Sequence, residues 1–191
     1  MKTVILWSSP NVDGLTASAK NHFLSGLRNC GEGNLEVREF HLNRMKMEHC
    51  IACGNGYGRC AGKGECVLRD DFRMLYEALI EADGIVLVSA VYWHDMTECM
   101  KAFIDRLRRC ETAHNHFLMD KRCFLIACAG GTGRGAAECL HSMEECLTHM
   151  KMRAYDRVSV TRFNKEYMLP ALEEAGKIYG QRIPDKFDMH Y

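Results

Sequence analysis

The stretch "TVILWSSPNVDGLTASA" (3–19) decides the fold. Its first part, "TVILW" (3–7), is apolar without alternation, which is typical of a parallel strand covered by helices on both faces. The next part, "SSPNVDGLT" (8–16), consists mainly of small, hydroxyl and turn-forming residues, and a helical apolar pattern runs through 15–29. A strand, a short loop and a helix in this order predict the first unit of an α/β protein.

The rest of the chain repeats this unit. "GIVLVS" (84–89) and "CFLIACA" (123–129) are also apolar on both faces, whereas "LEVREF" (35–40) and "DRVSV" (156–160) alternate. Alternation predicts strands with one exposed face, which belong at the edges of a sheet. We therefore predict a flavodoxin-like, doubly wound sheet of five parallel strands in the order 2-1-3-4-5, within three layers. Helices are expected at 70–82, 97–109, 135–150 and 166–180, besides the first.

Length and composition narrow the class of protein. The 191 residues predict one domain (1–180) with a Cys-rich insertion loop (45–69) and a C-terminal tail (181–191). Lys and Arg together number 25, as do Asp and Glu, and this balance argues against binding to nucleic acid or to an anionic membrane. No apolar run approaches the roughly 18 residues of a membrane span. The N-terminus is expected to be a strand and not a signal peptide, which predicts a cytoplasmic protein.

Three loops are expected at the carboxyl edge of the sheet, because parallel strands end on the same side. The first loop (8–16) can surround a phosphate with its amides and hydroxyls at a helix N-terminus, or it is a plain turn with Thr16 as the N-cap. In the second (89–96), Tyr92 and Trp93 either pack against a flat ligand or cover the core. The third, "AGGTGRG" (129–135), has so little bulk that a ligand could rest on its backbone.

Four cysteines lie close together in the insertion loop. They are Cys50, Cys53, Cys60 and Cys66, with the spacing C-x2-C-x6-C-x5-C. Four thiolates on a flexible loop suit an iron–sulfur cluster, but free thiols facing a substrate or partner are an alternative. Zinc and a disulfide are weaker hypotheses, because there is one CxxC pair and the compartment is expected to be reducing. The other seven cysteines are interpreted as small buried hydrophobic residues in a reduced state.

Several segments together resemble a known family. "SSPNVDGLT", "GECVLRDDF", "EADGIVLVSAVYW", "MKAFIDR" and "GGTGRG" occur in this order. Over roughly residues 1–150 the chain resembles the NADPH-dependent FMN reductase and iron–sulfur flavoprotein family, and "CVLRDD" (66–71) and "KAFIDR" (101–106) are the most specific segments. The resemblance implies FMN as the cofactor, NAD(P)H as co-substrate, and a homodimer or homotetramer.

The resemblance also implies the site residues. It places the FMN phosphate on the first loop and the isoalloxazine ring between the second and third, and in the iron–sulfur branch it assigns a [4Fe-4S] cluster to the four loop cysteines. No general acid or base is assigned, although His94 and Arg134 are near the site in sequence. The sequence departs from the family at Leu15 and Ala90, and the first loop has no Lys or Arg. The residues implied to bind FMN are Ser9, Asn11, Gly14, Leu15, Thr16, Ala90, Val91, Tyr92, Trp93, Gly130, Gly131, Thr132 and Gly133.

Three functions follow as hypotheses. The leading one is an FMN-dependent oxidoreductase that takes electrons from NAD(P)H or a reduced ferredoxin-like carrier and passes them to a small-molecule or protein acceptor. The second is an iron–sulfur flavoprotein that carries electrons without turning over small substrates. The third, suggested by the departures in the loops, is a flavodoxin-like binding module without flavin.

Overall fold

A single parallel sheet organises the chain. The computed structural model describes residues 1–31, 33–111 and 116–182. Its five strands lie in the order β2-β1-β3-β4-β5, with every neighbouring pair parallel, so the predicted topology is confirmed. The strands are β1 (Lys2–Ser8), β2 (Glu36–His41), β3 (Gly84–Ala90), β4 (Arg122–Ala129) and β5 (Arg153–Thr161).

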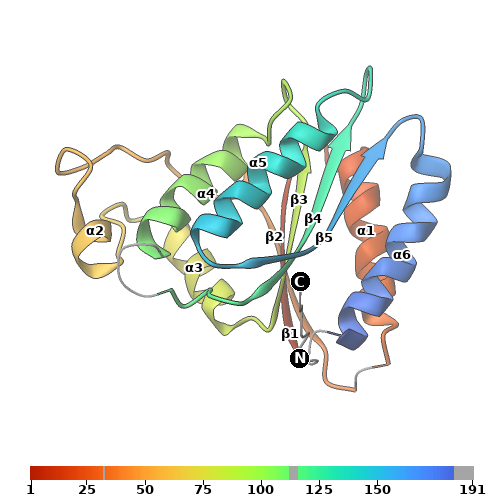
Figure 1. The fold of residues 1–191 in the computed structure, drawn as a ribbon, viewed down its shortest axis with the longest axis horizontal. Helices are drawn as coiled ribbons and strands as arrows, with labels where there is room; N and C mark the ends of the chain where they lie inside the picture. Colours follow the sequence, from red (N-terminus) through yellow and green to blue (C-terminus); the bar gives the residue numbers. More distant parts are fainter. Residues whose placement is uncertain (32, 112–115, 183–191) are drawn as a thin grey trace.

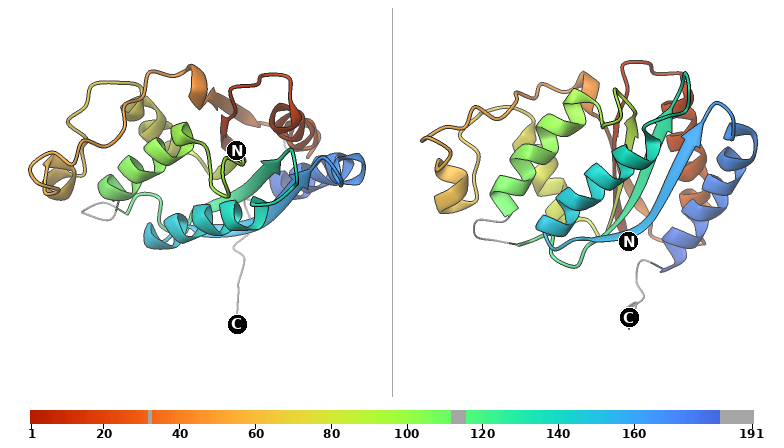
Figure 2. Two further views of the ribbon diagram at one scale, coloured as in Figure 1. Left: turned by 90° about the horizontal axis from the view of Figure 1, so that it is seen from above. Right: turned by 45° about the horizontal axis from the view of Figure 1, so that its top comes forward.

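Helices cover both faces of the sheet (Figures 1 and 2). The helices α1 (Leu15–Arg28) and α6 (Lys165–Arg182) pack on one face, whereas α3 (Phe72–Glu81), α4 (Glu98–Cys110) and α5 (Ala136–His149) pack on the other. The apolar core is accordingly divided into two clusters, one on each side of the sheet. Every residue of β3 is buried, while β2 and β5 have exposed positions, as the apolar patterns predict.

Two glycines allow α1 and α6 to cross closely. A Cβ atom added at Gly26 would lie 1.7 Å from the carbonyl oxygen of Glu173, and one added at Gly176 would lie 2.1 Å from that of Phe23. No larger residue can therefore occupy either position at this helix separation. This contact fixes α1, whose N-terminus points to the carboxyl edge of the sheet (Figure 1).

The predicted insertion loop (45–69) extends away from the sheet beside α3 and α4 (Figures 1 and 2). It follows the short helix η1 (Leu42–Arg44) and contains α2 (Arg59–Lys63). The first two residues of the predicted tail belong to α6, and 183–191 lie outside the described residues. Among the described helices, none combines the length and the apolar content that a membrane span requires.

Candidate functional site

The loops that follow β1, β3 and β4 meet at the carboxyl edge of the sheet and enclose a crevice of about 480 Å³. All the residues implied to bind FMN line this crevice except Gly133. His94, Cys128, Ala129 and Arg134 line it as well. The sheet topology thus brings together residues that are more than a hundred positions apart in the chain.

The N-terminus of α1 forms one end of the crevice. The helix begins at Leu15, its N-cap is Gly14, and no side chain caps it, so the alternative that Thr16 is the N-cap is wrong. The first turn contains no acidic residue, and Asp13 is exposed. Uncapped amides together with the helix dipole make an anion site. A Cβ at residue 14 would lie 2.8 Å from Nδ2 of Asn11, so the exposed Asn11 side chain would have to shift to admit a larger residue.

Three buried hydroxyl groups hold the crevice loops from below. Thr97 Oγ1 donates to Ser8 Oγ at 2.7 Å, and Ser8 Oγ lies 3.3 Å from Ser89 Oγ. The backbone N–H of Thr97 donates to Ser89 Oγ at 3.1 Å. All three residues are fully buried, and they join the ends of β1 and β3 to the start of α4. Sequence reasoning missed Thr97, although its place before a helix is typical of an N-cap.

The loop after β3 presents its aromatic residues to solvent. Tyr92 and Asp95 exchange two backbone hydrogen bonds, and the two residues between them, Trp93 and His94, have φ angles of 52° and 70°. Side chains larger than glycine are strained in this left-handed region, typically by about 1–3 kcal/mol. Trp93 is 97% exposed and Tyr92 is 42% exposed, so the alternative that both rings cover the core is wrong.

Two titratable groups at the crevice have raised pKa values. Partial burial and the nearby Glu98 raise the pKa of the Tyr92 phenol, so it stays protonated and can donate a hydrogen bond. Burial raises the pKa of the Cys128 thiol to about 12, although a hydrogen bond with Thr16 opposes this shift. His94 Nδ1 lies 3.5 Å from Glu138 Oε1 at the rim. We assign no general acid or base among these groups or to the exposed Arg134.

The loop after β4 supplies a floor without side chains. Cβ atoms added at Gly130 and Gly131 would meet nothing within 4 Å, so the space above them is open. Gly133 instead turns toward Phe163, whose ring would lie 3.3 Å from an added Cβ. Phe163 follows β5 and is exposed; its proximity to the third loop could not be read from the sequence. The uncapped helix end, the open floor and a volume within the usual range for cofactor sites together fit FMN.

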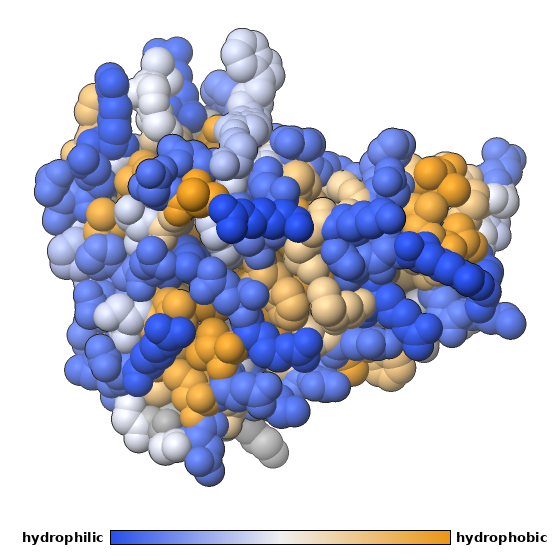
Figure 3. Space-filling view, turned by 180° about the vertical axis from the view of Figure 1, so that it is seen from behind, coloured by the Kyte–Doolittle hydropathy of each residue, from blue (hydrophilic) through white to orange (hydrophobic). Residues whose placement is uncertain are grey.

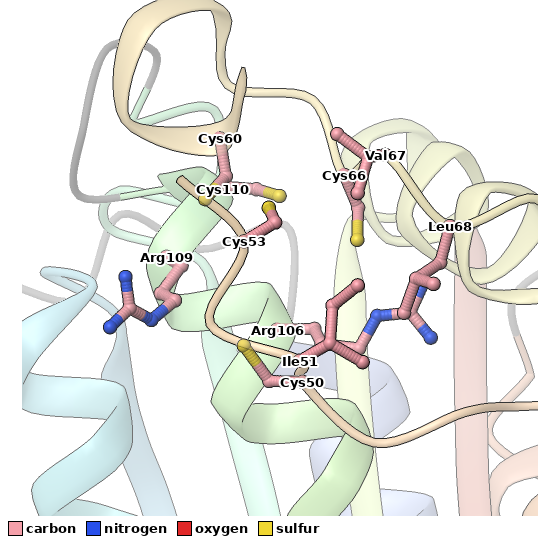
Figure 4. A pocket seen from close by; sticks show the side chains of 10 residues that line it. All are labelled: Cys50, Ile51, Cys53, Cys60, Cys66, Val67, Leu68, Arg106, Arg109 and Cys110. Atoms are coloured by element: carbon pink, nitrogen blue, oxygen red, sulfur yellow. The ribbon is translucent and has the colours of Figure 1, made fainter. Parts of the chain in front are cut away.

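A second, much smaller cavity of about 20 Å³ lies under the insertion loop. Cys50, Cys53, Cys60 and Cys66 all line it, together with Cys110 from the end of α4. Figure 4 shows the sulfur atoms of Cys50 and Cys66 apart from those of Cys53, Cys60 and Cys110. Burial, together with the neighbouring Cys66 and Cys60, raises the pKa of the Cys110 thiol to about 12, so Cys110 is protonated near neutral pH.

A buried ion pair holds the insertion loop against α4. Arg106 donates to both carboxylate oxygens of Asp70, at 2.6 and 2.8 Å, and to the backbone carbonyl of Glu48 at 2.8 Å. The side chains of Arg106 and Asp70 are 1% and 2% exposed. Burial by itself would raise the pKa of Asp70, but its hydrogen bonds and the charge of Arg106 outweigh this effect and lower the pKa. The guanidinium also stacks on Phe72, with 4.3 Å to the ring centroid.

The cysteine cavity fits an iron–sulfur cluster in donor chemistry but not in its present arrangement. Among the described residues, no three Cys, His, Asp or Glu side chains are placed to hold a metal ion. The cavity has room for about one water molecule, far less than a cubane cluster requires. Ligation by Cys50, Cys53, Cys60 and Cys66 stays a prediction, and we derive no electron-transfer step through a cluster.

The fold and the crevice define a class of protein, the flavodoxin-like α/β proteins with a ligand site at the carboxyl edge of the sheet. A family model described as NADPH-dependent FMN reductase matches residues 1–165. The chain belongs to this family.

Sequence relatives agree with this assignment, and a solved structure shares the fold. An iron-sulfur flavoprotein of Archaeoglobus fulgidus is 37% identical over 56% of this chain and 46% of its own length. An iron-sulfur flavoprotein of Methanocaldococcus jannaschii is 33% identical over 72% of this chain and 66% of its own length. This chain thus spans about half to two thirds of these relatives. An azoreductase of Bacillus anthracis has the same fold, with a TM-score of 0.71 and 16% identity over 95% of this chain and all of the other.

Proposed function

We propose that this protein is an FMN-dependent oxidoreductase that takes electrons from NAD(P)H or a reduced carrier and delivers them to a small-molecule or protein acceptor. The single observation that carries the proposal is the crevice, where an uncapped helix end faces a glycine floor and an exposed aromatic loop. Family membership supports the same cofactor and donor.

Different residues of the crevice hold the phosphate and the ring of FMN. Backbone amides at Leu15 and Thr16 bind the phosphate, and the Tyr92–Trp93 loop and the Gly130–Gly131 segment bind the ring from two sides. When bound there, FMN would supply the redox chemistry that links the electron donor to the acceptor. The open face beside the exposed Trp93 leaves a route for donor and acceptor to reach the ring.

An anaerobic titration tests this proposal. The protein as purified, or after addition of FMN, should be yellow with one flavin per chain, and NADPH should bleach the flavin absorbance within seconds. Colourless protein that also refuses added FMN would contradict the proposal and favour a binding module without flavin. Flavin that resists NADPH but is reduced by ferredoxin would favour an electron carrier.

A second candidate, the iron–sulfur electron carrier, is favoured by the five cysteines that line one cavity. Both sequence relatives described above bear the name iron-sulfur flavoprotein. Assays for iron and acid-labile sulfide on protein purified under argon test this candidate. About four of each per chain would support a cubane cluster, and none after anaerobic reconstitution would exclude it.

We also propose that the protein forms a homo-oligomer through the end that carries the insertion loop. Ile51, Tyr57, Val67 and Phe117 are large apolar residues with exposed side chains near this end. Apolar side chains gather there in the view from behind (Figure 3). Exposed apolar patches commonly mark interfaces between proteins. Light scattering should give the mass of a dimer or tetramer, and a monomer at every concentration would contradict this proposal.

A further inference from the structure

The carboxyl end of β2 contributes a side chain that touches the first crevice loop. His41, the last residue of β2, pairs in register with Trp7 of β1, so the two side chains lie on the same face of the sheet. Their rings stack with centroids 3.7 Å apart and planes only 6° from parallel. From this position Nε2 of His41 lies 2.8 Å from the backbone carbonyl oxygen of Ser9.

The direction of this hydrogen bond is fixed by its acceptor. A carbonyl oxygen can only accept, so Nε2 must carry the hydrogen and His41 must donate. The imidazole cannot easily turn away, because Trp7 is only 5% exposed and its indole holds the ring in a stack. Lys20 Nζ lies 5.3 Å from the Trp7 ring centroid and 2.8 Å from Glu39 Oε1, which further packs the stack.

The peptide group that accepts this bond is unusual within the loop. Ser9 precedes Pro10, and proline has no backbone N–H. This peptide can therefore offer only a carbonyl oxygen, whose partial negative charge would repel a phosphate group. At the other end of the loop, the peptides at the start of α1 do carry N–H groups without a side-chain cap. An anion site here requires that the Ser9 carbonyl be kept turned aside.

We propose that His41 is a positioning residue for the phosphate of the flavin: by donating to the Ser9 carbonyl it keeps the peptide that cannot donate turned aside, and so leaves the uncapped N–H groups at the start of α1 facing the anion. The inference rests on the proposed FMN site. It also supplies an account of how a loop without Lys or Arg retains a phosphate, since the preorganised amides take the place of a cation.

Two variants separate the hydrogen bond from the stack. His41→Phe keeps a flat ring against Trp7 and loses the donor, whereas His41→Gln keeps an N–H donor and loses the stack. The comparison that matters is between FMN and riboflavin, which share the ring system and differ by the phosphate. His149→Phe, at an exposed position at the end of α5, is the matched control.

We expect His41→Phe to weaken FMN binding about tenfold, the usual range for one lost hydrogen bond in a preorganised site, and riboflavin binding less than twofold. His41→Gln should recover most of the FMN affinity. Binding is measured by quenching of flavin fluorescence. As a second measurement, inorganic phosphate is titrated while the ¹⁵N amide signals of Leu15 and Thr16 are followed; these shifts should require several-fold more phosphate in the Phe variant.

The outcomes are distinguishable. Wild-type protein that binds no FMN overturns the proposed function, and this inference with it. Wild-type protein that binds FMN, together with a Phe variant that loses both flavins equally or neither, overturns the positioning role alone. A Gln variant no better than Phe would show that Nε2 is not the group responsible.

Discussion

The crevice and the cysteine cavity are built by opposite means. The crevice is open, formed largely by backbone, and placed by the sheet, because three parallel strands end where its loops begin. The cysteine cavity is small, formed largely by side chains, and covered by a loop that the buried ion pair between Arg106 and Asp70 holds against α4. A site that depends on topology should therefore survive most single substitutions of its side chains, whereas a site whose loop is anchored by a buried ion pair should be sensitive to the loss of either partner.

The largest expected effect comes from breaking that pair. Arg106→Met leaves the Asp70 carboxylate buried without its partner, and this should reduce the free energy of unfolding by about 3–5 kcal/mol. The loop cysteines should become more reactive, because Arg106 also holds the carbonyl of Glu48. Urea unfolding gives the stability, and the rate of reaction with a thiol reagent gives the loop opening.

A double variant is the control for this prediction. Arg106→Met combined with Asp70→Leu removes both charges and should recover much of the lost stability. FMN binding by the folded fraction should change little in either protein. If the single variant were as stable as wild type, the ion pair would not be what holds the loop over the cysteine cavity.

The next effect is a loss of stability at alkaline pH. Burial raises the pKa of Cys110 to about 12 from an ordinary value of 9.0. The thiol therefore stays protonated to a higher pH in the folded state than in the unfolded state. The resulting contribution of Cys110 to the free energy of unfolding is fully present below about pH 9 and is lost as the pH rises toward 12. From this thiol we expect a decrease on the order of 2 kcal/mol between pH 8 and pH 11.

The crevice carries a similar thiol, which makes the comparison sharper. Burial also raises the pKa of Cys128 to about 12. In urea unfolding as a function of pH, Cys110→Ala and Cys128→Ala should each show a shallower alkaline decline than wild type. A decline that neither substitution alters would mean that other groups control alkaline stability.

A third prediction concerns FMN binding when a large side chain is added to the open floor of the crevice. Gly130→Leu should weaken FMN binding about tenfold or more, because its side chain would enter the crevice. It should change the free energy of unfolding by no more than about 0.5 kcal/mol, because nothing lies within 4 Å of the added Cβ. Gly62→Leu is the matched change in α2, where the space is also open, and it should leave FMN binding unchanged. Equal loss of FMN in both variants would contradict the assignment of the crevice.

The topology-based site could be predicted from the sequence to a large extent. Buried and alternating strand patterns determined the sheet order, and the order determined which loops meet. The residues implied by the family resemblance then fell in one crevice, apart from Gly133, which turns toward Phe163. Backbone sites of this kind are predictable because the direction of a parallel strand already says where its following loop must lie.

The pair-based site could not be predicted in the same way. Cys110 was interpreted as a core residue, and it is buried, but it also faces the loop cysteines. The one feature of the sequence that could have indicated this contact is the spacing of four residues between Arg106 and Cys110, which places both on one face of α4. The contact of Arg106 with Asp70, 36 residues away, depends on how the loop folds back. His41 and Thr97 were missed for the same reason, since their partners are distant in sequence.

The smallest expected effect comes from relieving backbone strain, which occurs both in the crevice and in the insertion loop. Trp93 is held at φ 52°, which glycine adopts without cost, so Trp93→Gly should change the free energy of unfolding by no more than about 1 kcal/mol and in the stabilising direction. It should also weaken FMN binding several-fold, because an exposed ring at the crevice is lost. Ala52→Gly, at φ 46° in the insertion loop, relieves similar strain and should leave FMN binding unchanged. If Trp93→Gly bound FMN as well as wild type, the strained aromatic would have no part in holding the flavin, and the glycine floor with the helix end would have to account for the whole affinity.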